Sequence, residues 1–190
     1  MIRLTLVAGL AAGLCALAAC QEADGPTPVP AEPAPEAAPA VAAEPPPGPV
    51  PELAGKASAS SSTAMSLTGD VEFDGAMIRF ERGFELATAP ERIDLATAVY
   101  DDSGATWAQL LQAPEDSQVE LRRVVVDGPD PASRQGGLCG PPEAPATVGY
   151  VALIQEAEAV HMAVFAAGPT PGAQLPDTAL CGTFLYHFGD

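Results

Sequence analysis

Residues 67–81 read LTGDVEFDGAMIRFE, and this stretch indicates a β-hairpin. Apolar and polar residues alternate on both sides of Asp74-Gly75, the kind of dipeptide that two-residue type I′ turns prefer. With the turn placed there, Val71 faces Ile78, and the other apolar side chains join them on one face. The strand register and the single apolar face therefore both indicate a pair of antiparallel strands.

Sequence that is typical of β-strands continues through the second half of the chain. Further strands are predicted at 93–100, 118–126, 148–155, 160–166 and 182–188. The segments 148–155 and 160–166 are apolar on both faces, which is typical of fully buried strands. We expect them to form a central hairpin.

One short helix is predicted among these strands, near 104–112. Trp107 and Leu111 stand four residues apart on one helical face, and Asp102 or Ser103 could cap the first turn. Six or seven short strands with Gly/Pro-rich connections favour a mainly β fold. We expect a small antiparallel sandwich or barrel.

The charge balance narrows the classes of function. The chain has 190 residues, with 25 Asp and Glu against 8 Lys and Arg, and a formal net charge of −17. This balance argues against nucleic acid, whose phosphates require clustered cations. Lys56 is the single lysine, which excludes a phosphate-binding loop ending in Gly-Lys-Ser/Thr. Nothing in the sequence indicates a cofactor.

The N-terminus has the pattern of an export signal. Arg3 is the sole charge in the first twenty residues, and the apolar run over 4–17 is shorter than the ~20 residues that a permanent membrane span needs. The run ends in Leu17-Ala18-Ala19-Cys20, which resembles the lipobox of bacterial lipoproteins. Cys15 is a rival site, but Leu14 stands where that family has a small residue.

The resemblance implies how the mature chain is anchored. In that family the signal, here residues 1–19, is removed, and the cysteine, here Cys20, carries a diacylglycerol and an acylated amino group. Two or three acyl chains such as palmitate anchor a protein stably in a membrane. Gln21, in place of an aspartate, implies the outer membrane, with the remainder of the chain in the periplasm.

A tether is predicted next. Residues 21–62 contain 11 Pro and 11 Ala and few larger apolar side chains. Proline fixes φ and removes a backbone donor, so neither helix nor sheet propagates, and little apolar surface offsets the ordering entropy. We therefore expect a lipidated cysteine and disordered linker over 20–63, followed by a globular domain over 64–190.

The cysteine count agrees with export. Cys15 leaves with the signal and Cys20 takes the lipid, so Cys139 and Cys181 remain as an even pair. In an oxidising envelope we expect them to form a disulfide, which would contribute ~4 kcal/mol on the chain-entropy model. The alternative is two independent buried thiols.

Two motifs resemble known sites. Asp70, Glu72, Asp74 and Glu81 follow the spacing of an EF-hand calcium loop, but helices are not predicted around them, so the hairpin is preferred and no metal site is predicted. The run Asp102-Ser103-Gly104-Ala105 resembles the catalytic element of retroviral-type aspartic proteases, which would require a dimer.

The protease resemblance has a competing interpretation. Asp101 stands where the protease family has an apolar residue, and Asp-Ser-Gly is also common turn chemistry. His161 and His187 lie among apolar strand residues and are expected to serve packing or a rim. For Arg122-Arg123 we expect a bulge or an edge position, with an anion contact as the alternative.

These observations favour an envelope lipoprotein with a tethered, non-catalytic binding domain. The sequence does not name the partner of this domain, and another envelope protein is one candidate. Two alternatives stay open: an aspartic protease-like enzyme that uses Asp102 as a dimer, and a structural component of an envelope assembly.

The lipobox predicts that Cys20 is required for membrane attachment. In a Cys20→Ser variant we expect cleavage before residue 20 and acyl-dependent membrane binding both to be lost, because the thiol that accepts the lipid is absent. Cell fractionation and the intact mass of the mature chain measure this. A variant that still matures at residue 20 and stays in the membrane through acyl chains would contradict the assignment.

Overall fold

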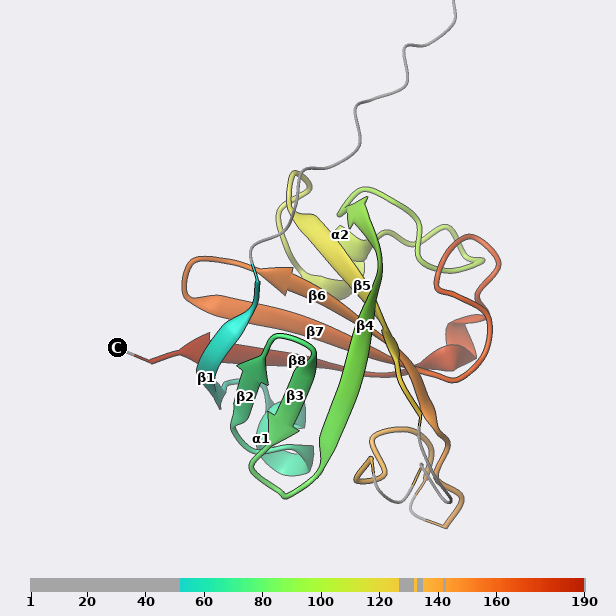
Figure 1. The fold of residues 1–190 in the computed structure, drawn as a ribbon. Coiled ribbons are helices and arrows are strands. Elements are labelled where there is room, and N and C mark those ends of the chain that lie inside the picture. The colour runs from blue at the N-terminus through green and yellow to red at the C-terminus, as the bar shows by residue number, and fades with distance from the viewer. Residues whose placement is uncertain (1–51, 127–131, 133–134, 142, 190) are drawn as a thin grey trace, which may run out of the picture. The chain divides into compact units, whose positions relative to one another are not determined.

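The computed structural model describes residues 52–126, 132, 135–141 and 143–189 (Figure 1). Residues 1–51 lie outside this part, so the signal, Cys20 and most of the expected linker are not described. Within the described ranges, no helix has the length and apolar character that a membrane span requires.

Eight antiparallel strands close into a barrel. They are β1 (Ala54–Ala59), β2 (Val71–Asp74), β3 (Met77–Phe80), β4 (Glu85–Leu95), β5 (Gln118–Val124), β6 (Val148–Gln155), β7 (Ala159–Ala166) and β8 (Leu180–Phe188). Each strand pairs with the next one along the chain, and β1 also pairs with β8. The predicted mainly β class is confirmed, and the architecture is the barrel rather than the sandwich.

Short helical segments accompany the barrel in the part of the chain that the structure describes. They are α1 (Ser62–Leu67), α2 (Trp107–Leu111) and a 3-10 turn, η1 (Asp177–Ala179). The helix predicted near 104–112 is present as α2, but its cap is Thr106 rather than Asp102 or Ser103. Thr106 accepts from the Gln109 backbone while the Gln109 side chain accepts from the Thr106 backbone, so the two form a capping box.

The predicted linker boundary is wrong by about ten residues, because β1 and α1 lie within 54–63. β1 pairs with β2 on one side and β8 on the other, and Ser61 caps α1 by accepting from the Ala64 N–H. Leu53 and Ala57 are 2% exposed. Two backbone ladders hold this Ala/Ser-rich strand, so it needs few large side chains of its own.

The hairpin of β2 and β3 is present with its turn displaced by one residue. Val71 pairs with Phe80 rather than with Ile78, and the two-residue loop is Gly75-Ala76. Gly75 has a φ of +55° at the first loop position, which is where type II′ turns place glycine. Because the partner changes by two residues, the same side chains still face the interior.

The strand predicted at 93–100 is wrong at both ends, since β4 covers 85–95. β3 pairs only with residues 85–87 of β4, so Pro90 lies beyond that ladder. A bulge between Pro90 and Arg92 accommodates the missing N–H in the pairing with β5. The strand was not predicted before residue 93 because Pro90 argues against a strand, although β4 continues through it.

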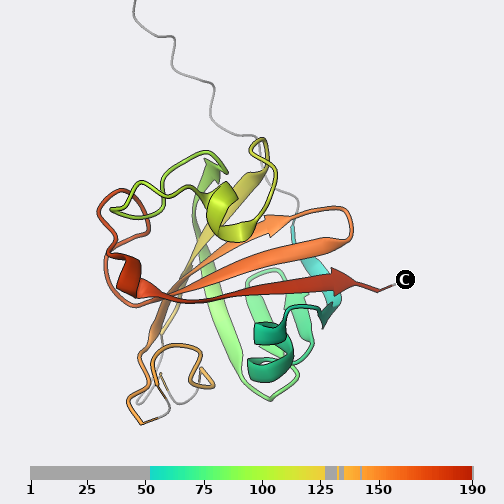
Figure 2. The ribbon, with the colours of Figure 1, turned by 180° about the vertical axis from the view of Figure 1, so that it is seen from behind.

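The central hairpin is confirmed as β6 and β7, and two apolar clusters explain its composition. Val151 and Leu153 of β6 point into the barrel, where they pack with residues of all eight strands. Tyr150 and Ile154 belong to a second cluster, which includes Trp107 and Leu111 of α2. Figure 2 shows α2 on the outside of the barrel. The strands are therefore buried on both faces.

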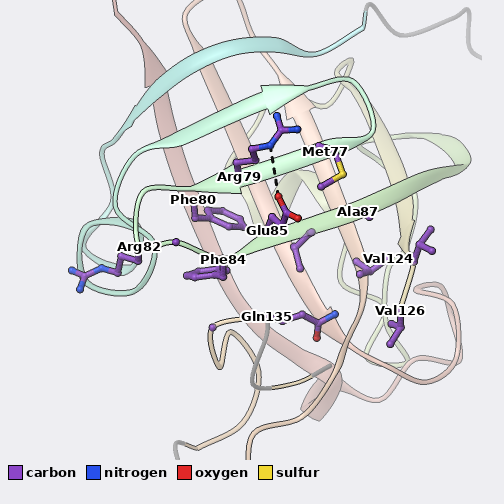
Figure 3. Close-up of a pocket in the computed structure, with 14 residues that line it drawn as sticks. Met77, Arg79, Phe80, Arg82, Phe84, Glu85, Ala87, Val124, Val126 and Gln135 are labelled. Carbon is purple, nitrogen blue, oxygen red and sulfur yellow. Dashed lines mark ion pairs between the residues drawn. The ribbon is translucent and has the colours of Figure 1, made fainter. Parts of the chain in front are cut away.

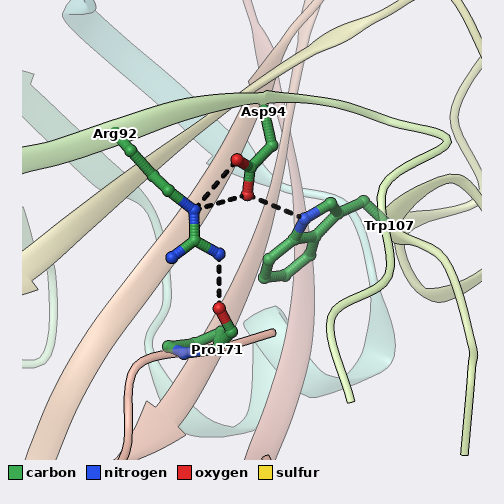
Figure 4. A network of polar contacts seen from close by, with 4 residues as sticks. All are labelled: Arg92, Asp94, Trp107 and Pro171. Carbon is green, nitrogen blue, oxygen red and sulfur yellow. Dashed lines mark hydrogen bonds and ion pairs between the residues drawn. The ribbon is translucent and has the colours of Figure 1, made fainter. Parts of the chain in front are cut away.

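A polar network ties that outer layer to the barrel (Figure 4). The Arg92 Nε lies 2.9 Å from both carboxylate oxygens of Asp94, and Arg92 Nη2 donates to the Pro171 carbonyl. The indole Nε1 of Trp107 donates to Asp94 over 3.3 Å. Asp94 thus joins β4 to α2, and Arg92 joins β4 to the loop before β8.

The structure places Cys139 and Cys181 at disulfide distance, with their Cα atoms 4.8 Å apart. Cys139 lies in the loop between β5 and β6, and Cys181 lies near the start of β8. A bond between them would fasten that long loop to the barrel.

We expect the protein to carry this bond in an oxidising environment. Treatment with iodoacetamide without reductant should leave the intact mass unchanged, because no thiol is free. After reduction in denaturant, two alkyl groups should be added. Labelling of two thiols before reduction would contradict the pairing.

Candidate functional site

A groove lies beside the turn between β3 and β4 (Figure 3). It has a volume of about 790 Å³ and is open to solvent along one side. Its apolar lining includes Met77, Phe84, Ala87, Val125 and Val126. The groove therefore combines side chains from β3, β4, the end of β5 and the following loop.

Aromatic side chains form one wall. The rings of Phe80 and Phe84 lie 4.7 Å apart between centroids, and Phe84 covers Gly136 from the other side. A Cβ on Gly136 would lie 2.4 Å from the Phe84 ring, and the φ of Gly136 is +68°. Glycine is thus required there by both contact and backbone conformation.

The loop that supplies Gly136 is held in three ways. Gln135 is 6% exposed, and its side-chain oxygen accepts from the Val148 N–H over 2.7 Å. Leu138 is buried in the barrel cluster, and Cys139 lies at disulfide distance from β8. The groove wall is therefore anchored to the barrel rather than resting on solvent-exposed loop contacts.

Exposed apolar residues gather at this place. Four large hydrophobic side chains are exposed in the described part of the chain, and Val125 and Val126, at 38% and 43%, are two of them. The other two, Met65 and Leu67, belong to α1. The predicted strand 118–126 ends at Val124, which leaves this Val pair beyond the ladder and in the groove.

Charged side chains lie at the rim. Arg79 contacts Asp74 over 2.9 Å and Glu85 over 3.7 Å, and the hydrogen bond to Asp74 raises the pKa of its guanidinium. Arg82 donates to the Met65 carbonyl over 3.1 Å, and Figure 3 shows it directed away from Phe84. The rim thus carries Arg82 and an Arg79 that is paired with two carboxylates.

Arg122 lies inside the barrel, so the expected bulge or edge position is wrong. It is 5% exposed and pairs with Glu120 over 2.9 Å, while its Nη1 donates to the Gly75 carbonyl. The bulge belongs to β4, opposite this residue. Arg123 points outward and approaches Glu91 at 3.6 Å. The buried pair links β5 to the β2–β3 turn and leaves little charge for an external anion.

The two aspartates of the protease-like motif have different positions. Asp101 is 2% exposed and accepts from the Ser103 N–H, the Ser103 hydroxyl and the Ala105 N–H over 2.7–3.1 Å. Burial alone would raise the pKa of Asp101, but these hydrogen bonds, with one from Tyr100, outweigh it and lower the pKa. Asp102 is exposed, and its backbone N–H donates to Leu175. Asp101, rather than Asp102, therefore accepts the hydrogen bonds that hold this turn.

The remaining candidate residues do not lie together at one site. Asp70 accepts from the Ala59 N–H, and Glu81 accepts from the Asp70 N–H, as part of the hairpin. His161 lies 3.6 Å from Glu156, and His187 is exposed on β8. Among the residues that the structure describes, no three His, Cys, Asp or Glu side chains are grouped to hold a metal.

The fold and the groove together define a small eight-stranded antiparallel barrel with an open apolar groove. Comparison of the chain with family models, with curated proteins and with solved structures finds no match. Sequence reasoning missed the groove. The run Val124-Val125-Val126 was its one local signal, because three consecutive apolar residues cannot all face the interior of a strand.

The lowered pKa of Asp101 predicts a pH-dependent contribution to stability. A lowered pKa means that the ionised Asp101 carboxylate stabilises the fold at pH values above the ordinary pKa of an aspartate. This contribution is lost as the pH falls through the folded-state pKa. Asp101→Asn should therefore lower the free energy of unfolding by roughly 1–3 kcal/mol near neutral pH, and by less in acid.

Urea unfolding between about pH 3 and pH 7 measures the effect. Asp102→Asn is the matched control, because it makes the same chemical change on an exposed neighbour. Equal effects of the two substitutions at every pH would contradict the role given to Asp101.

Proposed function

We propose that the chain is an envelope lipoprotein, anchored through acyl chains on Cys20, and that its barrel is a non-catalytic binding domain. The observation that carries the proposal is the groove, where two exposed apolar side chains, Val125 and Val126, line a hollow together with Met77 and Phe84. Its ligand is an envelope protein that inserts apolar side chains beside Phe84 and Val126.

Burial energetics support a binding role. Removing apolar surface from water contributes roughly 25 cal/mol per Å², so Val125 and Val126 at the groove are a source of binding free energy that the free domain does not use. Exposed apolar patches with polar rims are typical of interaction sites. The groove walls are held by Gly136 and Gln135, so little ordering has to accompany binding.

The polar groups near the groove favour binding over catalysis. No histidine or cysteine lines it in the described part of the chain, and its acid, Glu85, pairs with Arg79 at the rim. Acid–base chemistry needs a titratable group directed at the bound molecule. The alternative of an aspartic protease-like enzyme that uses Asp102 receives no further support, because Asp101 has the buried and hydrogen-bonded position in that turn.

The proposal is tested by photo-crosslinking in the cells that express the protein. A benzoyl-phenylalanine residue is introduced at Val126 in the whole lipidated chain, and at Leu67 as the control, since the two are exposed to a similar extent, 43% and 47%. Illumination should give a discrete protein adduct from position 126 and not from position 67, because only Val126 lines the groove.

A second substitution makes the result specific. Val125→Asp places a charge in the groove at an exposed site and should weaken the adduct several-fold, with the barrel still folded. Adducts of equal strength from both labelled positions, or an adduct that Val125→Asp leaves unchanged, would contradict the groove as the binding site.

A further inference from the structure

Arg82 differs from the other arginines that the structure describes. Each of the others lies 2.9–3.6 Å from its nearest carboxylate oxygen, in the pairs Arg79–Asp74, Arg92–Asp94, Arg122–Glu120 and Arg123–Glu91. Arg82 forms no such pair with any described residue, and it is exposed. A cation without a carboxylate partner therefore faces solvent in a chain whose net charge is −17.

Hydrogen bonds to α1 and its C-cap hold Arg82 in place. Its backbone N–H donates to the Thr68 carbonyl over 3.3 Å, and its Nη2 donates to the Met65 carbonyl over 3.1 Å. A guanidinium has five N–H donors, so most of them remain for another acceptor. Because the side chain is already positioned, little ordering of it has to accompany the binding of an anion.

The acids nearest to Arg82 in the sequence have other partners. An oxygen of the Glu81 side chain accepts from the Asp70 N–H over 3.1 Å. Glu85 lies 3.7 Å from Arg79. Neither carboxylate pairs with Arg82, so its positive charge is available to an external group.

Arg82 belongs to the lining of the groove. It contributes there together with Gly83 and Phe84, while Val125 and Val126 contribute from the end of β5 and the following loop. Figure 3 shows Arg82 and Val126 on opposite sides of the hollow. A ligand in the groove therefore meets apolar side chains along its length and a cation at one end.

Charge makes this end selective. The chain has 25 Asp and Glu against 8 Lys and Arg, so an acidic group is repelled by most positions on its surface. At Arg82 the same group is attracted. Attraction at one point combined with repulsion elsewhere fixes the orientation in which a partner binds.

We propose that Arg82 binds the carboxylate of an aspartate or glutamate on the envelope partner, beside the apolar side chains that enter the groove. The inference rests on the groove being the binding site, as proposed above. It adds a chemical requirement, which is an acidic residue at one end of an apolar segment. The planar guanidinium can hold a carboxylate through two parallel hydrogen bonds, which a lysine does not reproduce.

Substitutions of Arg82 in the whole lipidated chain test the pairing, with benzoyl-phenylalanine at Val126 as the label. Arg82→Glu should lower the yield of the external adduct in cells about tenfold, because it places a carboxylate against the partner's acid. Arg82→Lys keeps the charge but not the planar group, and should lower the yield about twofold. Circular dichroism of each purified variant verifies that the barrel is folded.

Arg123→Glu is the matched control. It makes the same change of charge at an arginine that is also exposed, with a side-chain exposure of 53%, and that does not line the groove. This substitution should leave the adduct unchanged.

A charge reversal in the partner gives the second readout. Mass spectrometry of the adduct identifies the linked partner peptide, which should contain an aspartate or glutamate near the link. Replacing that acid by lysine should lower the adduct of the chain with Arg82 and restore the adduct of the Arg82→Glu chain. A structural effect of Arg82 on its own turn would not be rescued by a change in another protein.

The outcomes separate the two proposals. An adduct that Arg82→Glu leaves unchanged, or lowers no more than Arg123→Glu does, would overturn the pairing and leave the groove as the binding site. A linked peptide without an acid would do the same. A lipid adduct, or no adduct at all from position 126, would overturn the proposed function and this inference with it.

Discussion

Closure of the sheet by pairing of β1 with β8 is the constraint on which the other features depend. Ala57 pairs with Phe188 and Ala59 with Tyr186, so the first strand joins the last across almost the whole domain. Closure removes both sheet edges and creates an interior that large side chains must fill. Small residues make up most of β1, and Gly55, which has a φ of +119°, lies beside the Phe188 ring. α1 follows directly, and its Thr68 contacts the buried Tyr186 hydroxyl at 2.8 Å. Burial raises the pKa of that tyrosine, so it stays a neutral hydrogen-bonding group.

The outer layer and the groove follow from how the barrel is covered. On the side of β5, β6 and β7, the layer with Trp107 shields the strands and is held by the Asp94 carboxylate. On the side of β3 and β4, no such layer is present among the described residues, and Phe84 and Val126 remain accessible. The loop with Gly136 and Cys139 stands at the edge of this uncovered side. An open apolar groove is therefore what remains where the covering of the barrel ends, and the position of a single loop sets one of its walls.

The comparison between prediction and structure shows which signals are local. The alternation over 67–81 and the two-sided apolar pattern of 148–166 predicted the right strands, because both reflect backbone geometry and burial of the segment itself. The turn position and the β4 boundaries were wrong, because Gly75 can serve at either loop position and because Pro90 is tolerated only through a bulge paired with β5. β1 was missed because its short run of small residues gives no strand signal by itself. Its strand conformation depends on the hydrogen bonds that β2 and β8 supply. The candidate site was missed for a similar reason, since its residues come from three separate segments.

Residue type and short-range spacing were enough to predict the mainly β class, the central hairpin, the paired cysteines and the acidic character. The same holds for the lipobox-like run 17–20 and the proline-rich segment, which were interpreted without a fold. Closure of the sheet, the inward position of Arg122 and the turn held by Asp101 rather than Asp102 became visible in the folded chain alone. The same is true of the grouping of Phe84, Val126 and Gly136. These features depend on contacts between segments far apart in the chain, and the energy of such contacts is absent from any local pattern.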